Sequence, residues 1–168
     1  DRIAETVRNI ETDLVVNVQG DEPLITQEVI DSVVQPMLED SNLKMTTAAC
    51  EINNKQELEN PNVVKVTMDN QSFALYFSRS KIPYPGREKE NSLSFYKHLG
   101  LYSYRKDFLL HLTKLPQSSL EKAESLEQLR ALENGYKIKV VKTKYDGIGV
   151  DTKEDLEKVI QQIARMQK

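Results

Sequence analysis

The chain has 168 residues, which is enough for one domain with a substantial core. Its 26 acidic and 23 basic residues give a formal net charge of −3 and are mixed along the sequence, so they form no broad basic surface for nucleic acid or anionic lipid. The single cysteine excludes an internal disulfide and suits a reducing compartment, and no apolar run approaches the roughly 20 residues of a membrane span. We therefore predict a cytoplasmic protein without nucleic-acid or membrane partners.

The first half of the chain predicts alternating helices and strands. The apolar spacing indicates helices at residues 2–12 and 26–38 and strands at 14–18 and 45–51. A hairpin is predicted from residues 63–67 and 73–78, which flank a short turn. The polar loop that follows, residues 81–95, is longer than is usual inside a compact domain, and we expect it to be flexible or to contact a partner.

The second half continues with a strand at residues 96–104, in which His98, Gly100, Tyr102 and Tyr104 lie on one face. A short helix near residue 110 and a longer one from Ser119 to about residue 132 are predicted next. A strand at 138–141, a connection with two glycines and a final helix at 152–166 complete the chain. Helices and strands alternate around an antiparallel hairpin, which predicts an α/β fold.

Two aspartates are candidate metal ligands. Asp21 belongs to a Gln-Gly-Asp-Glu-Pro turn at the end of a buried strand, where ligands of open α/β sheets bind, and a carboxylate there suits Mg²⁺. Alternatively, Asp21 only closes the turn before Pro23. Asp151 follows two glycines that allow close backbone approach, and its alternative role is that of a helix N-cap.

Several polar residues are candidates for ligand binding. The Arg79 guanidinium suits a carboxylate or phosphate, although a solvated surface arginine is the commoner case. His98 and Tyr102 share a strand face that suits a polyol, whereas a lone histidine is more often structural. The helix predicted from Ser119 carries a polar row that is commonly a solvated face, formed by Glu124, Glu127 and Gln128.

Ordered blocks along nearly the whole chain resemble the 3-deoxy-manno-octulosonate (KDO) cytidylyltransferase family, also called CMP-KDO synthetases. The blocks are residues 16–23, 60–66, 74–79 with 82–83, 98–105, 120–130 and 149–156. The resemblance implies a three-layer, Rossmann-like nucleotidyltransferase fold with a mixed, mostly parallel sheet and helices on both faces. It also implies that the anomeric hydroxyl of KDO attacks the α-phosphorus of CTP, giving pyrophosphate and CMP-KDO for lipopolysaccharide biosynthesis.

The resemblance also implies roles for individual residues. Mg²⁺ is the implied cofactor, and its ligands match Asp21 and Asp151, which are then the catalytic residues. Arg79 would bind the sugar carboxylate. The remaining residues of the implied sugar pocket are Gln19, His98, Tyr102, Glu127 and Gln128.

The sequence departs from the family at its front. Family members begin with a strand and a loop bearing arginine and lysine that bind cytosine and triphosphate, and residues 1–168 contain no such stretch. We expect residues 1–168 to be the C-terminal portion of a single cytidylyltransferase domain, incomplete at the N-terminus and inactive when isolated. Because family members are homodimers, a homodimer is expected, and residues 81–95 are a candidate dimer contact.

Two alternative functions remain open from the sequence. One is a cytidylyltransferase for another acidic sugar, such as sialic acid or an amino-KDO, because the metal pair would be shared and only pocket residues would differ. The other is a sugar- or nucleotide-binding module without catalysis. Whether the arginine- and lysine-bearing loop precedes Asp1 discriminates the enzyme from the binding module.

Overall fold

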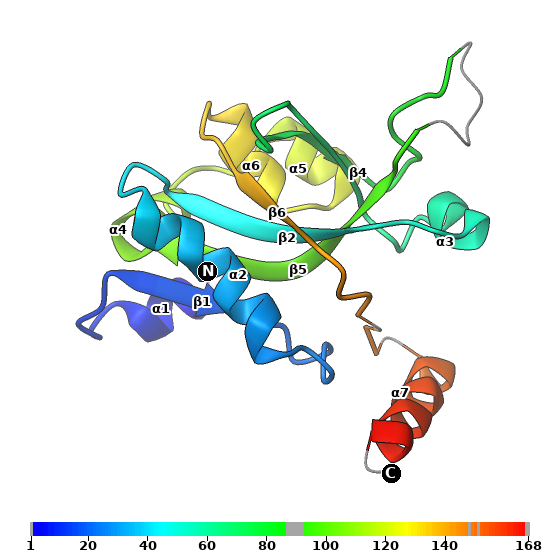
Figure 1. Ribbon diagram of the computed structural model, residues 1–168. Coiled ribbons are helices and arrows are strands. Elements are labelled where there is room, and N and C mark those ends of the chain that lie inside the picture. Colours follow the sequence, from blue (N-terminus) through cyan, green and yellow to red (C-terminus); the bar gives the residue numbers. More distant parts are fainter. Residues whose placement is uncertain (1, 87–92, 148, 151, 167–168) are drawn as a thin grey trace.

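The computed structural model describes residues 2–86, 93–147, 149–150 and 152–166, and these form a mixed sheet between two layers of helices (Figure 1). The strands are β1 (Leu14–Asn17), β2 (Met45–Glu51), β3 (Lys65–Met68), β4 (Ala74–Ser78), β5 (Tyr96–Arg105) and β6 (Lys139–Thr143). The helices are α1 (Arg2–Val7), α2 (Gln27–Glu39), α3 (Lys55–Glu59), α4 (Lys106–Leu112), α5 (Ser119–Glu124), α6 (Gln128–Glu133) and α7 (Lys153–Met166).

The sheet has the strand order β4-β3-β5-β2-β6, with β1 also paired to β5. The mixed α/β class is confirmed, but a mostly parallel sheet is not found in the described residues. There β2 and β6 pair in parallel, whereas β5 runs antiparallel to β1, β2 and β3, and β3 runs antiparallel to β4. A short hairpin accounts for the β3–β4 pair, since a tight turn joins antiparallel strands and parallel pairing needs a longer crossover.

One edge of β5 is shared by two strands. β1 pairs with the end of β5, where Asn17 lies opposite Tyr102, and β3 pairs with its start, where Lys65 lies opposite Lys97. Residues 99–101 lie between these two pairings. On the other edge, the register with β2 shifts at the same level, between Thr47 and Ala48. The middle of β5 is therefore the point at which the regular ladder is interrupted.

Helices cover both faces of the sheet, as predicted (Figure 1). On one face, Val29 and Val33 of α2 pack against Ala48, Leu99 and Leu101. The opposite face carries α1, α4, α5 and α6 over a larger apolar cluster. That cluster includes Val15, Met45, Phe77, Tyr104, Phe108, Leu109, Leu129, Ile138 and Val140. The sheet is thus buried from both sides around the middle of β5.

The helix predicted from Ser119 is broken into α5 and α6. Ser125 between them has φ 54° and ψ 48°, the left-handed conformation that ends a helix. The carbonyl of Glu124 accepts a hydrogen bond from Arg79 Nε at 2.9 Å, and this partner lies on the chain after β4. The Glu124 carbonyl therefore accepts a tertiary hydrogen bond in place of the backbone N–H that a continuous helix would supply.

Other helix boundaries also differ from the predictions. α1 ends at Val7 rather than near residue 12, and α3 was not predicted. Asn54 begins α3 by accepting a hydrogen bond from the Glu57 amide at 2.7 Å. At the start of α7, Thr152 and Asp155 form capping contacts, whereas Asp151, for which a helix N-cap was the alternative prediction, lies outside the described residues.

The C-terminal helix α7 lies apart from the sheet, at the end of the connection that follows β6 (Figure 1). Among its apolar residues, Val159 is buried, whereas Ile160 is 56% exposed and Ile163 is 38% exposed. In the part of the chain that the structure describes, no helix has both the length and the apolar character to cross a membrane.

The buried ion pair between Glu121 and Arg130 gives a stability prediction. Arg130 Nε lies 2.8 Å from Glu121 Oε2, and Nη2 lies 2.5 Å from Oε1, in a bidentate pair that joins α5 to α6. Arg130→Met would leave the Glu121 carboxylate buried without its partner, so we expect the free energy of unfolding to fall by about 3 kcal/mol. Urea denaturation followed by circular dichroism measures the loss.

The surface pair between Lys81 and Glu59, at 3.1 Å, provides the control because 53% of the Glu59 side chain is exposed. Glu59→Gln should change the free energy of unfolding by less than about 1 kcal/mol. Equal losses in the Arg130→Met and Glu59→Gln variants would contradict the importance of the buried pair.

Candidate functional site

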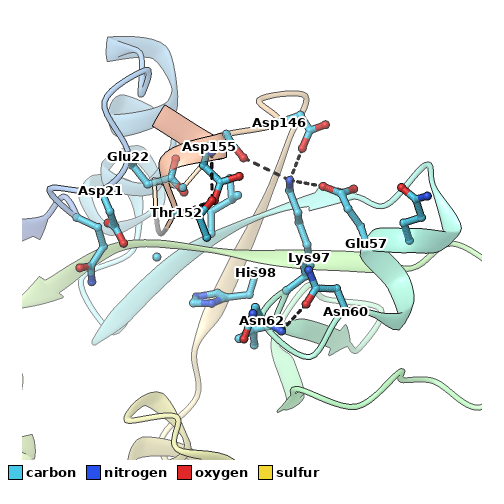
Figure 2. A pocket seen from close by; sticks show the side chains of 18 of the residues that line it. Asp21, Glu22, Glu57, Asn60, Asn62, Lys97, His98, Asp146, Thr152 and Asp155 are labelled. Carbon is cyan, nitrogen blue, oxygen red and sulfur yellow. Dashed lines mark hydrogen bonds and ion pairs between the residues drawn. The ribbon is translucent and has the colours of Figure 1, made fainter. Parts of the chain in front are cut away.

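A cavity of about 920 Å³ lies beside the first half of β5 (Figure 2). Five segments far apart in the sequence line it: the turn after β1, α3 with its following loop, Arg79 after β4, the start of β5, and the connection from β6 into α7. The residues labelled in Figure 2 are polar or charged. This composition suits a hydrophilic ligand.

The turn after β1 enters the cavity next to the interrupted part of β5. A Cβ atom added to Gly100 would lie 3.0 Å from Gln19 Cγ, so the glycine allows the Gln19 side chain to lie against the strand. Gln19 itself is exposed toward the cavity. The predicted site residue Gln19 therefore lies where β5 has no neighbouring strand to cover it.

The two sequence motifs that contain the candidate metal ligands meet in this cavity. The backbone N–H of Val150 donates to the Asp21 carbonyl at 2.9 Å, although 129 positions separate these residues in the chain. The Asp21 carboxylate is exposed and makes no hydrogen bond or ion pair with the described residues. Asp151 lies outside the described residues, so its position is not part of this geometry.

Glu22 links the same two segments a second time. The Tyr145 hydroxyl donates to Glu22 Oε2 at 3.3 Å, and Gly147 lies against both side chains. Burial raises the pKa of the Glu22 carboxyl, although the Tyr145 hydrogen bond acts in the opposite direction. The turn after β1 and the connection after β6 thus form one packed unit at the cavity wall.

Lys97 crosses the cavity wall from β5 and holds the connection from its other side (Figure 2). Its ammonium forms ion pairs with Glu57, at 3.1 Å, and with Asp146, and it donates to the Gly147 carbonyl at 3.4 Å. Burial disfavours the charged form, but the bonds to Asp146 and Glu57 outweigh it and raise the pKa of the Lys97 ammonium. Lys97 therefore joins α3, β5 and the connection after β6.

His98 lines the cavity and is also bonded within the protein. Thr47 Oγ1 donates its single proton to the Leu101 carbonyl at 2.8 Å and therefore accepts from His98 Nε2, 2.9 Å away. This assignment leaves Nδ1 as a hydrogen-bond acceptor. Burial lowers the pKa of His98 to about 3, so the ring is uncharged at neutral pH. An uncharged imidazole can accept from a hydroxyl group but contributes no positive charge to the site.

The predicted sugar-binding residues are divided between two cavities. Gln19, Arg79 and His98 line the larger one. A second cavity, of about 210 Å³, is lined by Gln19 again and by Tyr102, Glu127 and Gln128. His98 and Tyr102 lie in contact, with ring centroids 5.3 Å apart, so the predicted shared strand face is confirmed. Gln19 is common to both cavities and connects the two groups.

Glu124 differs from the solvated helix residue that the sequence suggested. Its carboxylate accepts hydrogen bonds from the Ser78 hydroxyl at 2.6 Å and from the Arg79 backbone N–H at 2.9 Å. Burial opposes the charged form, but these bonds outweigh it and lower the pKa of the Glu124 carboxyl. The break at Ser125 separates Glu124 from Glu127 and Gln128, which face the smaller cavity.

Comparison with known proteins identifies the family. A family model described as cytidylyltransferase matches residues 1–138. The chain belongs to the cytidylyltransferase family. It is 50% identical over 163 residues to the 3-deoxy-manno-octulosonate cytidylyltransferase of Fusobacterium nucleatum, covering 96% of this chain and 66% of that protein. The protein of the same name from Syntrophotalea carbinolica is 52% identical over 167 residues, covering 95% of this chain and 66% of its own length.

One solved structure agrees with this membership, and a second shares the fold. A CMP:2-keto-3-deoxy-manno-octonic acid synthetase complexed with CTP has a TM-score of 0.92 and 40% identity, covering 99% of this chain and 68% of that chain. A 4-diphosphocytidyl-2C-methyl-D-erythritol synthase from Anaerococcus prevotii has a TM-score of 0.56 and 16% identity, covering 98% of this chain and 64% of that one, and shares the fold. The chain thus spans about two thirds of the length of these relatives.

Sequence reasoning missed the residues that hold the cytidylyltransferase cavity together, namely Lys97, Glu57, Asp146, Glu22 and Tyr145. One signal was present for Lys97. It alternates with Leu99, Leu101 and Ser103 on the face of β5 that is otherwise buried, and a lysine at such a position needs partners. Its acidic partners come from distant segments, so the sequence alone did not identify them.

The uncharged state of His98 predicts a pH dependence of stability. Because the pKa of about 3 in the folded protein lies below the value of about 6.5 in an unfolded chain, the unfolded state binds more protons between these values. The contribution of uncharged His98 to the free energy of unfolding is therefore fully present above about pH 6.5 and is lost as the pH falls toward 3. From pH 7 to pH 5 we expect His98 to lower the free energy of unfolding by about 1–2 kcal/mol.

Urea titrations at pH 7 and pH 5 measure this dependence. His98→Gln should remove the part of the pH dependence that is due to His98, because glutamine does not titrate. An unchanged pH dependence in the His98→Gln variant would show that other groups are responsible.

Gly147 gives a test of the packed unit formed by the turn and the connection. A Cβ atom there would lie 2.5 Å from Tyr145 Cε1 and would also clash with Glu22 Oε2, whereas one on Gly149 would meet nothing within 4 Å. We expect Gly147→Ala to weaken the Val150–Asp21 hydrogen bond and to speed amide exchange of Val150 about tenfold. Gly149→Ala is the matched control and should leave that exchange unchanged; acceleration in both variants would argue against a specific clash.

Proposed function

We propose that this chain contributes the sugar- and metal-binding part of a 3-deoxy-manno-octulosonate cytidylyltransferase, which makes CMP-KDO from CTP and KDO. The supporting observation is the hydrogen bond from Val150 N to the Asp21 carbonyl, 2.9 Å long. This bond joins the turn that contains Asp21 to the connection at residues 149–150, beside a polar cavity. The product would serve lipopolysaccharide biosynthesis.

In the proposed reaction the anomeric hydroxyl oxygen of KDO bonds to the α-phosphorus of CTP while the bond to the β-phosphate oxygen breaks. The hydroxyl proton is released and pyrophosphate leaves, so no covalent intermediate with the protein is needed. The residues of the two cavities then act by orienting the sugar. Arg79 would bind the sugar carboxylate. Hydroxyl groups would be bound by Gln19, His98, Tyr102, Glu127 and Gln128.

Mg²⁺ is the cofactor we propose, and the donor chemistry at the turn after β1 fits it. The Asp21 carboxylate is exposed, lines the cavity and has no partner among the described residues. No group of three or more metal-binding side chains occurs in the described residues, but Mg²⁺ commonly uses one or two carboxylates with water and substrate phosphates. Asp21 and Asp151 would hold the ion, which would neutralise developing charge on the phosphates.

The proposal concerns the full-length protein, because the matched relatives are longer than this chain. CTP is the proposed nucleotide, since one structural relative is described as a complex with CTP. The family's loop for cytosine and triphosphate is not found within residues 1–168, which we assign to the C-terminal portion of one cytidylyltransferase domain. Residues 1–168 alone should therefore show little or no transferase activity.

We also propose a homodimer and a cytoplasmic location. Tyr84 is 86% exposed in the described part of the loop at residues 81–95, and Leu75 on the neighbouring strand β4 is 62% exposed. We propose that these exposed apolar side chains take part in the subunit contact. The free, buried Cys50 is consistent with a reducing compartment.

Asp21→Asn in the full-length protein tests the metal assignment. We expect Mg²⁺-dependent pyrophosphate release from CTP and KDO to fall at least about 100-fold, because the amide is a much weaker ligand for the cation. The far-ultraviolet circular dichroism spectrum should stay unchanged. Asp31→Asn changes an exposed carboxylate on α2 and should retain activity. Loss of folding in Asp21→Asn would instead assign Asp21 to closing the turn.

The same assay, with a panel of acidic sugars, tests the substrate. Pyrophosphate release with sialic acid or an amino-KDO but not with KDO would replace the proposed substrate. No release with any sugar, together with measurable binding, would favour a non-catalytic sugar- or nucleotide-binding module.

A further inference from the structure

Arg79 lies beside the larger cavity and is held on several sides by atoms that belong to the protein. Its Nε donates to the Glu124 carbonyl at 2.9 Å, and its Nη1 donates to the Pro61 carbonyl at 3.2 Å. These two contacts fix the plane of the guanidinium. Within the described residues Nη2 makes no hydrogen bond, so this nitrogen remains available to a ligand in the cavity.

Glu124 fixes the backbone of Arg79 from the side of α5. Its Oε2 accepts from the Arg79 backbone N–H at 2.9 Å, and its Oε1 accepts from the Ser78 hydroxyl at 2.6 Å. Because the Glu124 carbonyl also accepts from Arg79 Nε, one residue binds both the main chain and the side chain of Arg79. The break in the helix at Ser125 exposes that carbonyl for this contact.

Lys65 bonds to the backbone carbonyl of Arg79, whereas Glu124 bonds to the backbone N–H. This lysine on β3 has no exposed surface, and its ammonium group donates to the Arg79 carbonyl at 2.6 Å. It also donates to the carbonyls of Asn60, at 2.9 Å, and Val63, at 2.6 Å. All three ammonium protons are thus used, and two of them bind the loop whose Pro61 carbonyl accepts from Arg79 Nη1.

Core packing alone does not explain why a lysine is buried at position 65. A buried ammonium group loses its hydration, which lowers the pKa of Lys65, and carbonyl partners only offset that loss. An apolar side chain would fill the same volume without the penalty. What the ammonium group supplies, and an apolar side chain cannot, is a link between the loop at residues 60–63 and the Arg79 peptide unit.

We propose that Lys65 and Glu124 are positioning residues that set the direction of the Arg79 guanidinium toward a carboxylate in the larger cavity. This inference rests on the proposed function, in which Arg79 binds the carboxylate of the acidic sugar. Lys65 holds the carbonyl side of the Arg79 backbone, and Glu124 holds its amide side and Nε. Neither residue needs to touch the sugar.

Steady-state kinetics of the full-length protein, with CTP and KDO varied separately, test the inference. Lys65→Met keeps the length of the side chain but removes the three hydrogen bonds, and Glu124→Gln removes the charge that holds the Arg79 amide. Each should raise the KM for KDO about tenfold while the KM for CTP changes less than about twofold. A residue that only stabilises the fold would lower the active fraction and leave both KM values unchanged.

Lys139→Met is the matched control. Lys139 on β6 also donates from Nζ to a backbone carbonyl, that of Gln71 at 2.6 Å, but it is remote from the cavity residues. This variant should show wild-type KM values for both substrates. If Lys139→Met raised the KM for KDO as much as Lys65→Met, the effect would be general and the inference would be wrong.

A double-mutant cycle separates this inference from the function on which it depends. Arg79→Met should raise the KM for KDO, and adding Lys65→Met or Glu124→Gln should then have no further effect, because both act through Arg79. If Arg79→Met leaves that KM unchanged, the proposed role of Arg79 is wrong. If Arg79→Met raises it but Lys65→Met and Glu124→Gln do not, the positioning inference is wrong. Should Lys65→Met fail to fold by circular dichroism, the cycle with Glu124→Gln decides.

Discussion

The pairing of β5 determines where everything else in the site can lie. This strand bonds to β2 along one edge and to β1 and β3 at opposite ends of the other edge. Since two strands share an edge without meeting, the middle of β5 is left for side chains, and Gly100 admits Gln19 there. His98 and Tyr102 flank this point along the strand. A ligand site is thus built into the topology of the sheet.

Features of the fold that depend on neighbouring residues could be predicted from the sequence, whereas features that depend on contacts between distant segments could not. The six strands were predicted from apolar runs, because the burial of such runs is a local property of the sequence. The two helical layers were implied by the family resemblance. The two carboxylate motifs were found from their residues, and the Val150–Asp21 contact places them together as far as the described residues extend. The break at Ser125 was not predictable, because the competing partner of Glu124 is Arg79, which precedes it by 45 positions.

Three buried cations show how the molecule uses charge in its interior. Lys65 binds carbonyl groups, Lys97 binds two carboxylates and a carbonyl, and Arg130 forms a bidentate pair with Glu121. Each cation is bonded to carbonyl or carboxylate groups, as the cost of desolvation requires. Lys65 and Lys97 lie opposite each other on β3 and β5 and secure segments that line the same cavity. These two lysines therefore place charge where irregular chain, rather than regular strand, must be held.

The position of α7 has a consequence for how the molecule responds to its ligands. This helix lies apart from the sheet, with Ile160 largely exposed, so its local opening should cost little compared with unfolding of the core (Figure 1). Its connection nevertheless bonds to the turn after β1 through Val150 and Asp21. Any ligand that binds only while the turn and the connection are bonded to each other would raise the free energy of opening according to its concentration and affinity. Occupancy of the cavity would then be visible as resistance of the C-terminal helix to proteolysis.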